Sequence, residues 1–133
     1  MTNCKLIKRG DIFYIDIPED KNDKHKQIGC RPCVIISNDM NNKHCSRVQY
    51  IPLTSKINKT KLPTHVYLKE TKMEKESIAL CECIDAIDKS FIKEKVGVVS
   101  LSDMRRIEVG MTIQLYQGTR MQFTINNMQY ATA

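Results

Sequence analysis

The sequence predicts a mainly β protein of the α+β class: a small, partly closed antiparallel β-barrel with one C-terminal helix. At least five short apolar segments are separated by turn residues, whereas a single segment near the C-terminus has the spacing of an amphipathic helix. The length of 133 residues suffices for one domain with a buried core but not for two. Several short strands and one late helix favour a small barrel over a parallel sheet.

The strands are expected in the following order. Residues 11–17 form the first strand, and a long polar loop at residues 18–29 leads to the second strand at residues 31–37. Because loops longer than about a dozen residues are usually functional or mobile, this loop is a candidate flap that contacts the substrate. Further strands are expected at residues 48–53, 64–68 and 77–84, with loops at residues 38–47 and 54–63 and a Lys- and Glu-rich helical turn before residue 77.

The C-terminal part combines a short helical piece with one longer helix. Asp88 can cap a helical piece that runs to Lys95, and residues 96–99 form a brief apolar segment. Ser102 is the expected N-cap of the longer helix, which ends near Gly118. Its apolar stripe predicts core packing and consists of Met104, Ile107, Met111 and Leu115. Gly110 inside the helix costs roughly 1 kcal/mol relative to Ala, so we expect a close contact or a helix break there.

Composition narrows the function classes. Charged residues make up 27% and hydrophobic residues 41% of the chain, which excludes disordered and collagen-like proteins. The first residues lack the apolar core of a secretory signal, and no apolar run approaches the ~20 residues that span a bilayer, so we expect a cytoplasmic protein. The net charge is +6, and all of the excess lies in residues 1–66. This asymmetry favours a polyanionic partner, nucleic acid before membrane, although solubility alone is an alternative explanation.

Six cysteines raise the question of a metal or redox site. The pair Cys30 and Cys33 is followed by a strand rather than the helix that a thioredoxin-type motif needs. Cys81 and Cys83 are one residue too close for the second pair of a zinc ribbon. Because side chains alternate along a strand, Cys30 and Cys33 are expected on opposite faces. The preferred interpretation is therefore buried or half-buried free thiols, with no metal.

Arg31 is the most informative single residue. It follows Gly29 and Cys30, precedes Pro32 and begins a short buried strand, so its side chain is expected where the scaffold meets solvent. A guanidinium stays protonated at physiological pH and offers five donors in a planar fork, which suits a phosphate better than a lysine does. A surface ion pair is the alternative that position alone leaves open.

Five segments occur in the order found in MazF/PemK toxins: KRGDIFYIDI at residues 8–17, GCRPCVIISND at 29–39, IPLTS at 51–55, KLPTHV at 61–66 and SIALCECIDAIDK at 77–89. Across roughly residues 8–117, the chain resembles MazF-type endoribonucleases. The resemblance implies an SH3-like barrel, a homodimer without cofactor, and a cognate MazE-like antitoxin whose flexible acidic segment blocks the RNA groove. Residues 1–118 are then the toxin domain, and residues 119–133 a C-terminal extension that forms an edge strand or a partner surface.

The resemblance also implies the chemistry. Family members cut single-stranded mRNA to 2′,3′-cyclic phosphate and 5′-hydroxyl ends, so the nucleophile is the substrate's own 2′-hydroxyl and no metal is required. The catalytic positions correspond to Arg31, in the G-x-R-P motif, and Thr54, after the third strand. Arg31 can hold two phosphoryl oxygens, and Thr54 can donate to a third. Substrate contacts are expected from Gln27, Asn38, Ser55, Lys56 and His65.

Proton transfer and some family positions leave alternatives open. His25 and His65 are the imidazole candidates near these motifs. Many relatives carry Ser-Glu where this chain has His25-Lys26, and a glutamine and a basic residue where it has Cys83 and Asp85. Two further hypotheses are therefore kept: a catalytically weak or inactive MazF-like module that binds RNA or protein, and a gyrase-directed poison on the same barrel.

Overall fold

The computed structural model describes residues 6–19, 21–22, 28–57 and 62–116, and it confirms the mainly β architecture with a late helix. The strands in these ranges are β1 (Asp11–Ile17), β2 (Gly29–Ile35), β3 (Arg47–Thr54), β4 (His65–Leu68), β5 (Ser77–Leu80), β6 (Asp85–Asp88) and β7 (Ile92–Val98). The helices are α1 (Asp39–His44), α2 (Leu101–Leu115) and two single 3-10 turns at Cys81–Cys83 and Lys89–Phe91. No helix in the described part of the chain is long and apolar enough to cross a membrane.

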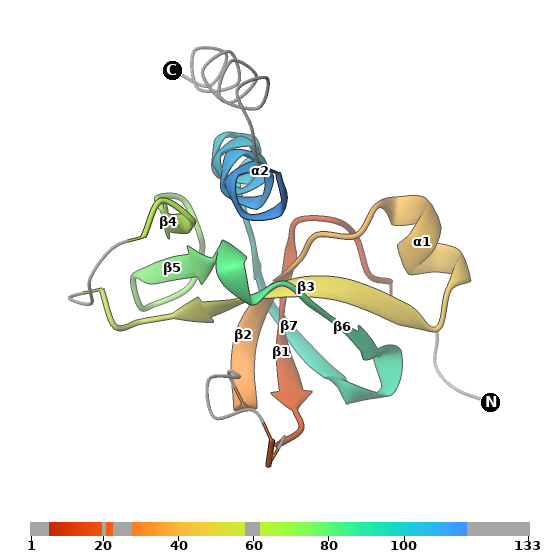
Figure 1. Cartoon of the computed structure of the whole chain (residues 1–133). Helices are drawn as coiled ribbons and strands as arrows, with labels where there is room; N and C mark the ends of the chain where they lie inside the picture. Colours follow the sequence, from red (N-terminus) through yellow and green to blue (C-terminus); the bar gives the residue numbers. More distant parts are fainter. Residues whose placement is uncertain (1–5, 20, 23–27, 58–61, 117–133) are drawn as a thin grey trace.

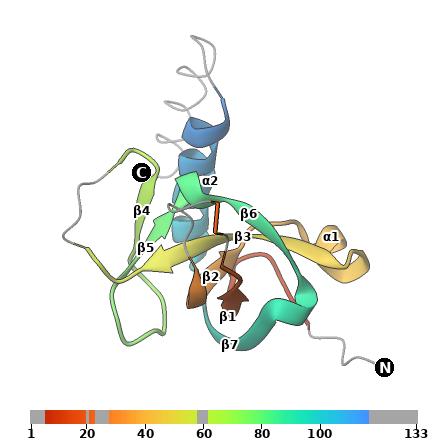
Figure 2. The same cartoon turned by 60° about the horizontal axis from the view of Figure 1, so that its bottom comes forward.

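The sheet is antiparallel and is organised around β3. Its strand order is β4-β5-β3-β2-β1-β7, and β6 also pairs with β3. One edge of β3 pairs with β2, whereas the other edge pairs with β6 near its start and with β5 at its end. In Figures 1 and 2, β4 and β5 lie at one end of β3 and α1 lies at the other. Within the described residues β4 and β7 do not pair with each other, so the sheet is open and "barrel" describes it only loosely.

Alternating side chains divide the core into two clusters, one on each face of the central strands. Ile12 and Val34 belong to the cluster beneath α2, whereas their neighbours Phe13 and Cys33 belong to the second cluster. All four are at most 3% exposed. Because both faces are covered, the central strands carry nearly continuous apolar runs rather than a polar and apolar alternation. This explains why residues 33–36 are all buried.

Helix α2 covers the first cluster and differs in detail from the prediction. Its N-cap is Ser100 rather than Ser102: the Ser100 hydroxyl accepts a hydrogen bond of 3.0 Å from the Asp103 N–H. Leu115, expected in the core, is 64% exposed. Gly110 marks a close contact and not a break, because a Cβ added at this position would lie only 2.7 Å from the Cys81 Sγ.

The predicted loop at residues 38–47 contains helix α1. Asn38 caps this helix by accepting a hydrogen bond of 2.8 Å from the Asn41 N–H. The buried Asn42 donates through its Nδ2 to the carbonyl of Ser37 at 2.9 Å. Side-chain hydrogen bonds therefore form a six-residue helix where the polar composition predicted a loop.

The prediction for the region between β4 and β7 was also partly wrong. The fifth strand ends at Leu80 and not near residue 84, because a 3-10 turn follows and the chain returns to β3 as β6. The predicted helical turn before residue 77 is absent from the described structure, which has only bends there. Asp88 is a cap, since it accepts a hydrogen bond of 2.9 Å from Ser90 N–H, but the helical piece ends at Phe91. Residues 92–98 then form strand β7, because they pair with β1.

Candidate functional site

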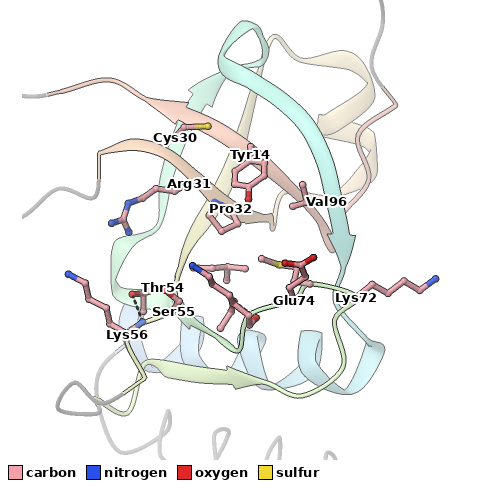
Figure 3. Close-up of a pocket in the computed structure, with 14 residues that line it drawn as sticks. Tyr14, Cys30, Arg31, Pro32, Thr54, Ser55, Lys56, Lys72, Glu74 and Val96 are labelled. Carbon is pink, nitrogen blue, oxygen red and sulfur yellow. Dashed lines mark hydrogen bonds between the residues drawn. The ribbon is translucent and has the colours of Figure 1, made fainter.

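A pocket of about 550 Å³ lies between β1, β2, the end of β3 and the connection from β4 to β5 (Figure 3). Its apolar lining residues are Tyr14, Pro32, Leu53, Met73 and Val96. Its charged and hydroxyl-bearing lining residues include Arg31, Thr54, Ser55, Lys56, Lys72, Glu74, Lys75 and Ser77. The sheet pairing therefore brings together four of the predicted site residues: Arg31, Thr54, Ser55 and Lys56.

Arg31 is fixed by the turn that precedes it. Gly29 has a φ of 87°, a left-handed conformation that favours glycine, and it starts β2. This turn allows Arg31 Nε to donate a hydrogen bond of 3.1 Å to the carbonyl of Ile28. No carboxylate in the described part of the chain pairs with the terminal nitrogens of Arg31, so the alternative of a surface ion pair is not formed there. The end of the guanidinium can therefore contact an anion in the pocket.

Thr54 is the last residue of β3 and is half-buried. Its Oγ1 accepts a hydrogen bond of 3.2 Å from the backbone N–H of Lys56, drawn as a dashed line in Figure 3. Because the hydroxyl oxygen is used as an acceptor, its hydrogen can still be donated to a ligand. Figure 3 shows Thr54, Lys56 and Arg31 at the same end of the pocket.

The electrostatics of the pocket favour an anionic ligand. Among the described lining residues, Arg31, Lys56, Lys72 and Lys75 are cationic, although Lys72 extends away from the pocket in Figure 3, and Glu74 is the one carboxylate. Ser55 and Lys56 are exposed, so their contribution to stability is small and they remain accessible. No imidazole is present among the lining residues that the structure describes.

Two other predicted substrate contacts lie elsewhere or cannot be placed. Asn38 does not line the pocket; it caps α1, which Figure 1 shows at the opposite end of β3. Gln27 lies outside the described residues, as do His25 and Lys26. A role for Asn38 or Gln27 in RNA binding stays a prediction.

His65 belongs to a hydrogen-bond network beside the pocket rather than to its lining. Its Nδ1 accepts a hydrogen bond of 3.2 Å from Leu62 N–H, so its Nε2 carries the proton and donates to Glu82 Oε2 at 2.8 Å. The other oxygen of Glu82 accepts from the Thr64 hydroxyl at 2.8 Å. This network fixes the end of the β3–β4 loop, and contact between His65 and RNA stays a prediction.

The cysteines agree only in part with the expected burial. Cys30 is exposed and lines the pocket, whereas Cys33 is 0% exposed, which confirms that the two lie on opposite faces. Cys45 is exposed as well, so the expectation of burial fails for Cys30 and Cys45. Burial raises the pKa of the Cys33 thiol well above its usual value and that of Cys81 to about 12, so both are neutral thiols at physiological pH. The described residues contain no group of three His, Cys, Asp or Glu side chains placed to hold a metal ion.

Tyr14 and the pocket residues of the β4–β5 connection were not among the predicted site residues. Tyr14 follows the buried Phe13 and is half-buried on the other face of β1, opposite Pro32 in the β1–β2 register. The sequence did hold a sign of this: Tyr14 is an aromatic residue that stands between two buried residues of a strand and therefore points to the opposite face. Lys72, Glu74 and Lys75 had no such signal, because their place in the pocket depends on how β4 and β5 pair with β3.

The open antiparallel sheet, the late helix and the cationic pocket define a small protein suited to binding a phosphate-bearing ligand. A family model described as "PemK-like, MazF-like toxin of type II toxin-antitoxin system" matches residues 8–115, and the chain belongs to this family.

Solved structures support the same fold. MazF (Form-I) from Deinococcus radiodurans is 18% identical, with a TM-score of 0.72, and the match covers 84% of this chain and 97% of that one. An endoribonuclease from a mycobacterial species is 20% identical with a TM-score of 0.67, covering 84% and 92%. An endoribonuclease in complex with its cognate antitoxin, also mycobacterial, is 21% identical with a TM-score of 0.64, covering 83% and 93%.

Proposed function

We propose that this toxin is a sequence-selective, metal-independent endoribonuclease that cleaves single-stranded mRNA in the cytoplasm. The observation that carries the proposal is the placement of Arg31 and Thr54, from β2 and β3, at one end of a single cationic pocket. A fixed guanidinium and a hydroxyl with a free hydrogen can stabilise the negative charge that develops in a phosphoryl transfer without metal. Membership of the toxin family and the endoribonuclease descriptions of similar structures support this proposal.

In the proposed reaction, the 2′-hydroxyl of the RNA attacks the adjacent phosphorus and the 5′-oxygen of the next nucleotide leaves. The 2′-hydroxyl gives up its proton and the leaving 5′-oxygen takes one up, so the products are a 2′,3′-cyclic phosphate and a 5′-hydroxyl. The pentavalent transition state carries extra negative charge, which the terminal nitrogens of Arg31 and the Thr54 hydroxyl stabilise. Removing one such donor typically costs about 3–4 kcal/mol of barrier.

The substrate also contacts the exposed residues beside Thr54. Ser55 and Lys56 line the same end of the pocket, where Lys56 attracts the phosphate backbone. The sequence prediction adds Gln27 from the β1–β2 loop to these contacts. Residues 1–118 form the toxin domain in this proposal, and residues 119–133 an extension to it.

A cognate MazE-like antitoxin neutralises the toxin. An acidic peptide competes with RNA for the cationic side chains of the pocket, because both are polyanions. The active toxin is a homodimer, in which each protomer supplies one pocket. The proposal of an antitoxin is supported by similar structures that contain one, such as the mycobacterial complex.

The proposal is tested by incubating the purified protein with a long RNA of low structure in EDTA. We expect discrete cuts with the wild-type chain and a loss of at least about 10²-fold in rate with Arg31→Ala. Arg105→Ala is the matched control, because Arg105 is an exposed arginine of α2 outside the pocket. Equal rates for Arg31→Ala and wild type contradict the proposal, and intact RNA with retained binding supports the inactive binding module instead.

A further inference from the structure

We propose that the pocket also binds one nucleobase next to the cleaved phosphate, and that Glu74 selects bases with an amino group over uracil. This inference rests on the proposed function for the identity of the ligand as RNA. It adds a specificity-determining residue from the β4–β5 connection, a segment in which sequence analysis placed no site residue.

The pocket has two chemically different parts. One end carries Arg31, Thr54 and Lys56, whereas Tyr14 and Glu74 lie away from that end (Figure 3). The volume of about 550 Å³ exceeds what a single phosphate group needs and falls within the range of about 300–1000 Å³ typical of small-molecule sites. A phosphate held by Arg31 therefore leaves space for an adjoining nucleoside.

The second part has the surface that a nucleobase requires. Tyr14 and Pro32 are opposite each other in the β1–β2 register, and both are half-buried with a remaining surface that lines the pocket. Met73 and Val96 complete this surface and pack against the core cluster beneath α2. Single-stranded RNA is commonly recognised by stacking of its unpaired bases on aromatic side chains. The planar ring of Tyr14 beside Pro32 provides such a contact.

Glu74 gives this part of the pocket its selectivity. It is the one carboxylate among the described lining residues, it is exposed, and it forms no ion pair or hydrogen bond with the other described residues. Its carboxylate is on the pocket side in Figure 3, whereas Lys72 extends away from the pocket. An ionised carboxylate only accepts hydrogen bonds. A ligand that approaches Glu74 must therefore present a donor.

The four RNA bases differ in this respect. Adenine N6, cytosine N4 and guanine N2 are amino donors, whereas uracil has a carbonyl oxygen where cytosine has its amino group. The one donor on this edge of uracil, N3–H, lies between two carbonyl oxygens whose lone pairs repel the carboxylate, so uracil pairs with Glu74 less well than a base with an amino group does. A good base-edge contact discriminates by about 1–3 kcal/mol, which corresponds to a preference of about 5- to 150-fold.

The first experiment measures the bases that flank the cuts. An RNA pool of random sequence is cleaved in EDTA, and the new ends are sequenced. We expect uracil to be depleted about 5- to 150-fold at one of the two nucleotides beside the cut for the wild-type chain. Glu74→Gln should reduce this depletion to below about 2-fold, because the amide of Gln can donate to the carbonyl of uracil as well as accept.

Glu70→Gln is the matched control. Glu70 lies in the same connection and is exposed, but it does not line the pocket, so the depletion of uracil should remain. Uracil that occurs as often as cytosine on both sides of the wild-type cuts overturns the inference. Depletion that is unchanged in Glu74→Gln overturns it too.

The second experiment measures binding without cleavage. Octanucleotides of cytidine and of uridine with 2′-O-methyl groups lack the nucleophile, and fluorescence anisotropy reports their affinity for each variant. The wild-type chain should bind the cytidine octamer more tightly, and Glu74→Gln should bind both equally. Tyr14→Ala should weaken both by about 5- to 150-fold through lost stacking, whereas Tyr14→Phe should keep both affinities. Equal affinity of the wild-type chain for the two octamers contradicts the inference.

The two experiments separate the two proposals. A chain that prefers the cytidine octamer but leaves RNA intact refutes the endoribonuclease and retains the base site. A chain that cuts RNA with no base preference dependent on Glu74 retains the endoribonuclease and refutes the base site.

Discussion

Replacing Thr54 by valine should separate the role of its hydroxyl in the reaction from its role in folding. Valine has nearly the same shape and favours strands, so the pairing of Thr54 with Ile78 in β5 should persist. The hydrogen bond of 3.2 Å from Lys56 N–H is lost, but this N–H is exposed and water can replace the hydroxyl. We therefore expect the free energy of unfolding to fall by no more than about 1 kcal/mol.

The kinetic cost of Thr54→Val should be much larger. The lost hydroxyl no longer donates to the phosphoryl group in the transition state, which removes about 3–4 kcal/mol and lowers kcat about 10²- to 10³-fold, with little change in KM. Single-turnover cleavage of a short RNA in EDTA measures the rate, and urea unfolding measures stability. Thr54→Ser keeps the hydroxyl and should stay within about 10-fold of the wild-type rate.

A hydroxyl on α2 provides the control. Thr112 donates its hydroxyl hydrogen to the Glu108 carbonyl at 2.8 Å, and it lies outside the pocket, so Thr112→Val should cleave at the wild-type rate. A Thr54→Val variant within about 5-fold of the wild-type rate would refute the reasoning. A Thr54→Ser variant as slow as Thr54→Val would do the same, because the hydroxyl would then not be the group that matters.

Two further predictions concern packing and the cysteines. Gly110→Ala should lower the free energy of unfolding by up to about 2 kcal/mol, since an overpacking cost of about 1–3 kcal/mol against Cys81 is offset only in part by the gain of about 1 kcal/mol in helix propensity. Urea unfolding should show a smaller cost in a Cys81→Ala background, and an equal cost in both backgrounds would contradict the contact. At pH 8 without denaturant, iodoacetamide should modify the exposed Cys30 and spare Cys33, whose burial excludes reagent and raises the pKa of its thiol. Mass spectrometry of digested protein measures both rates, and similar rates for the two cysteines would be evidence against their placement on opposite faces of β2.

The fold was predictable wherever the apolar pattern reflects burial. The strand at residues 11–17 has the expected bounds, and the late helix was located to within a few residues. The apolar pattern did not predict the secondary structure where tertiary contacts determine it. Helix α1 depends on caps and buried hydrogen bonds from Asn38 and Asn42, and β7 is a strand because it pairs with β1. Neither interaction leaves a hydrophobic period in the sequence.

The candidate site was predictable only in the part that depends on local chemistry. Arg31 lies in the G-x-R-P motif and Thr54 in the segment IPLTS, so the family resemblance could point to both from short segments. The wall formed by Met73 and Glu74 could not, because it comes near Arg31 only through the pairing of β4 and β5 with β3. Asn38 caps α1 outside the pocket, and its predicted contact with substrate stays a prediction.

The chemistry of the RNA ends tests the central claim most directly. A defined RNA is cleaved in EDTA beside a copy in which one 2′-deoxynucleotide stands immediately 5′ of the mapped cut. We predict 2′,3′-cyclic phosphate and 5′-hydroxyl ends on the RNA and no cleavage of the substituted copy, because its nucleophile is missing. Cleavage that persists at the 2′-deoxynucleotide, or that yields 5′-phosphate ends, would contradict the proposal. In either case, the reaction that Arg31 and Thr54 assist would not begin with attack by the substrate's own 2′-hydroxyl.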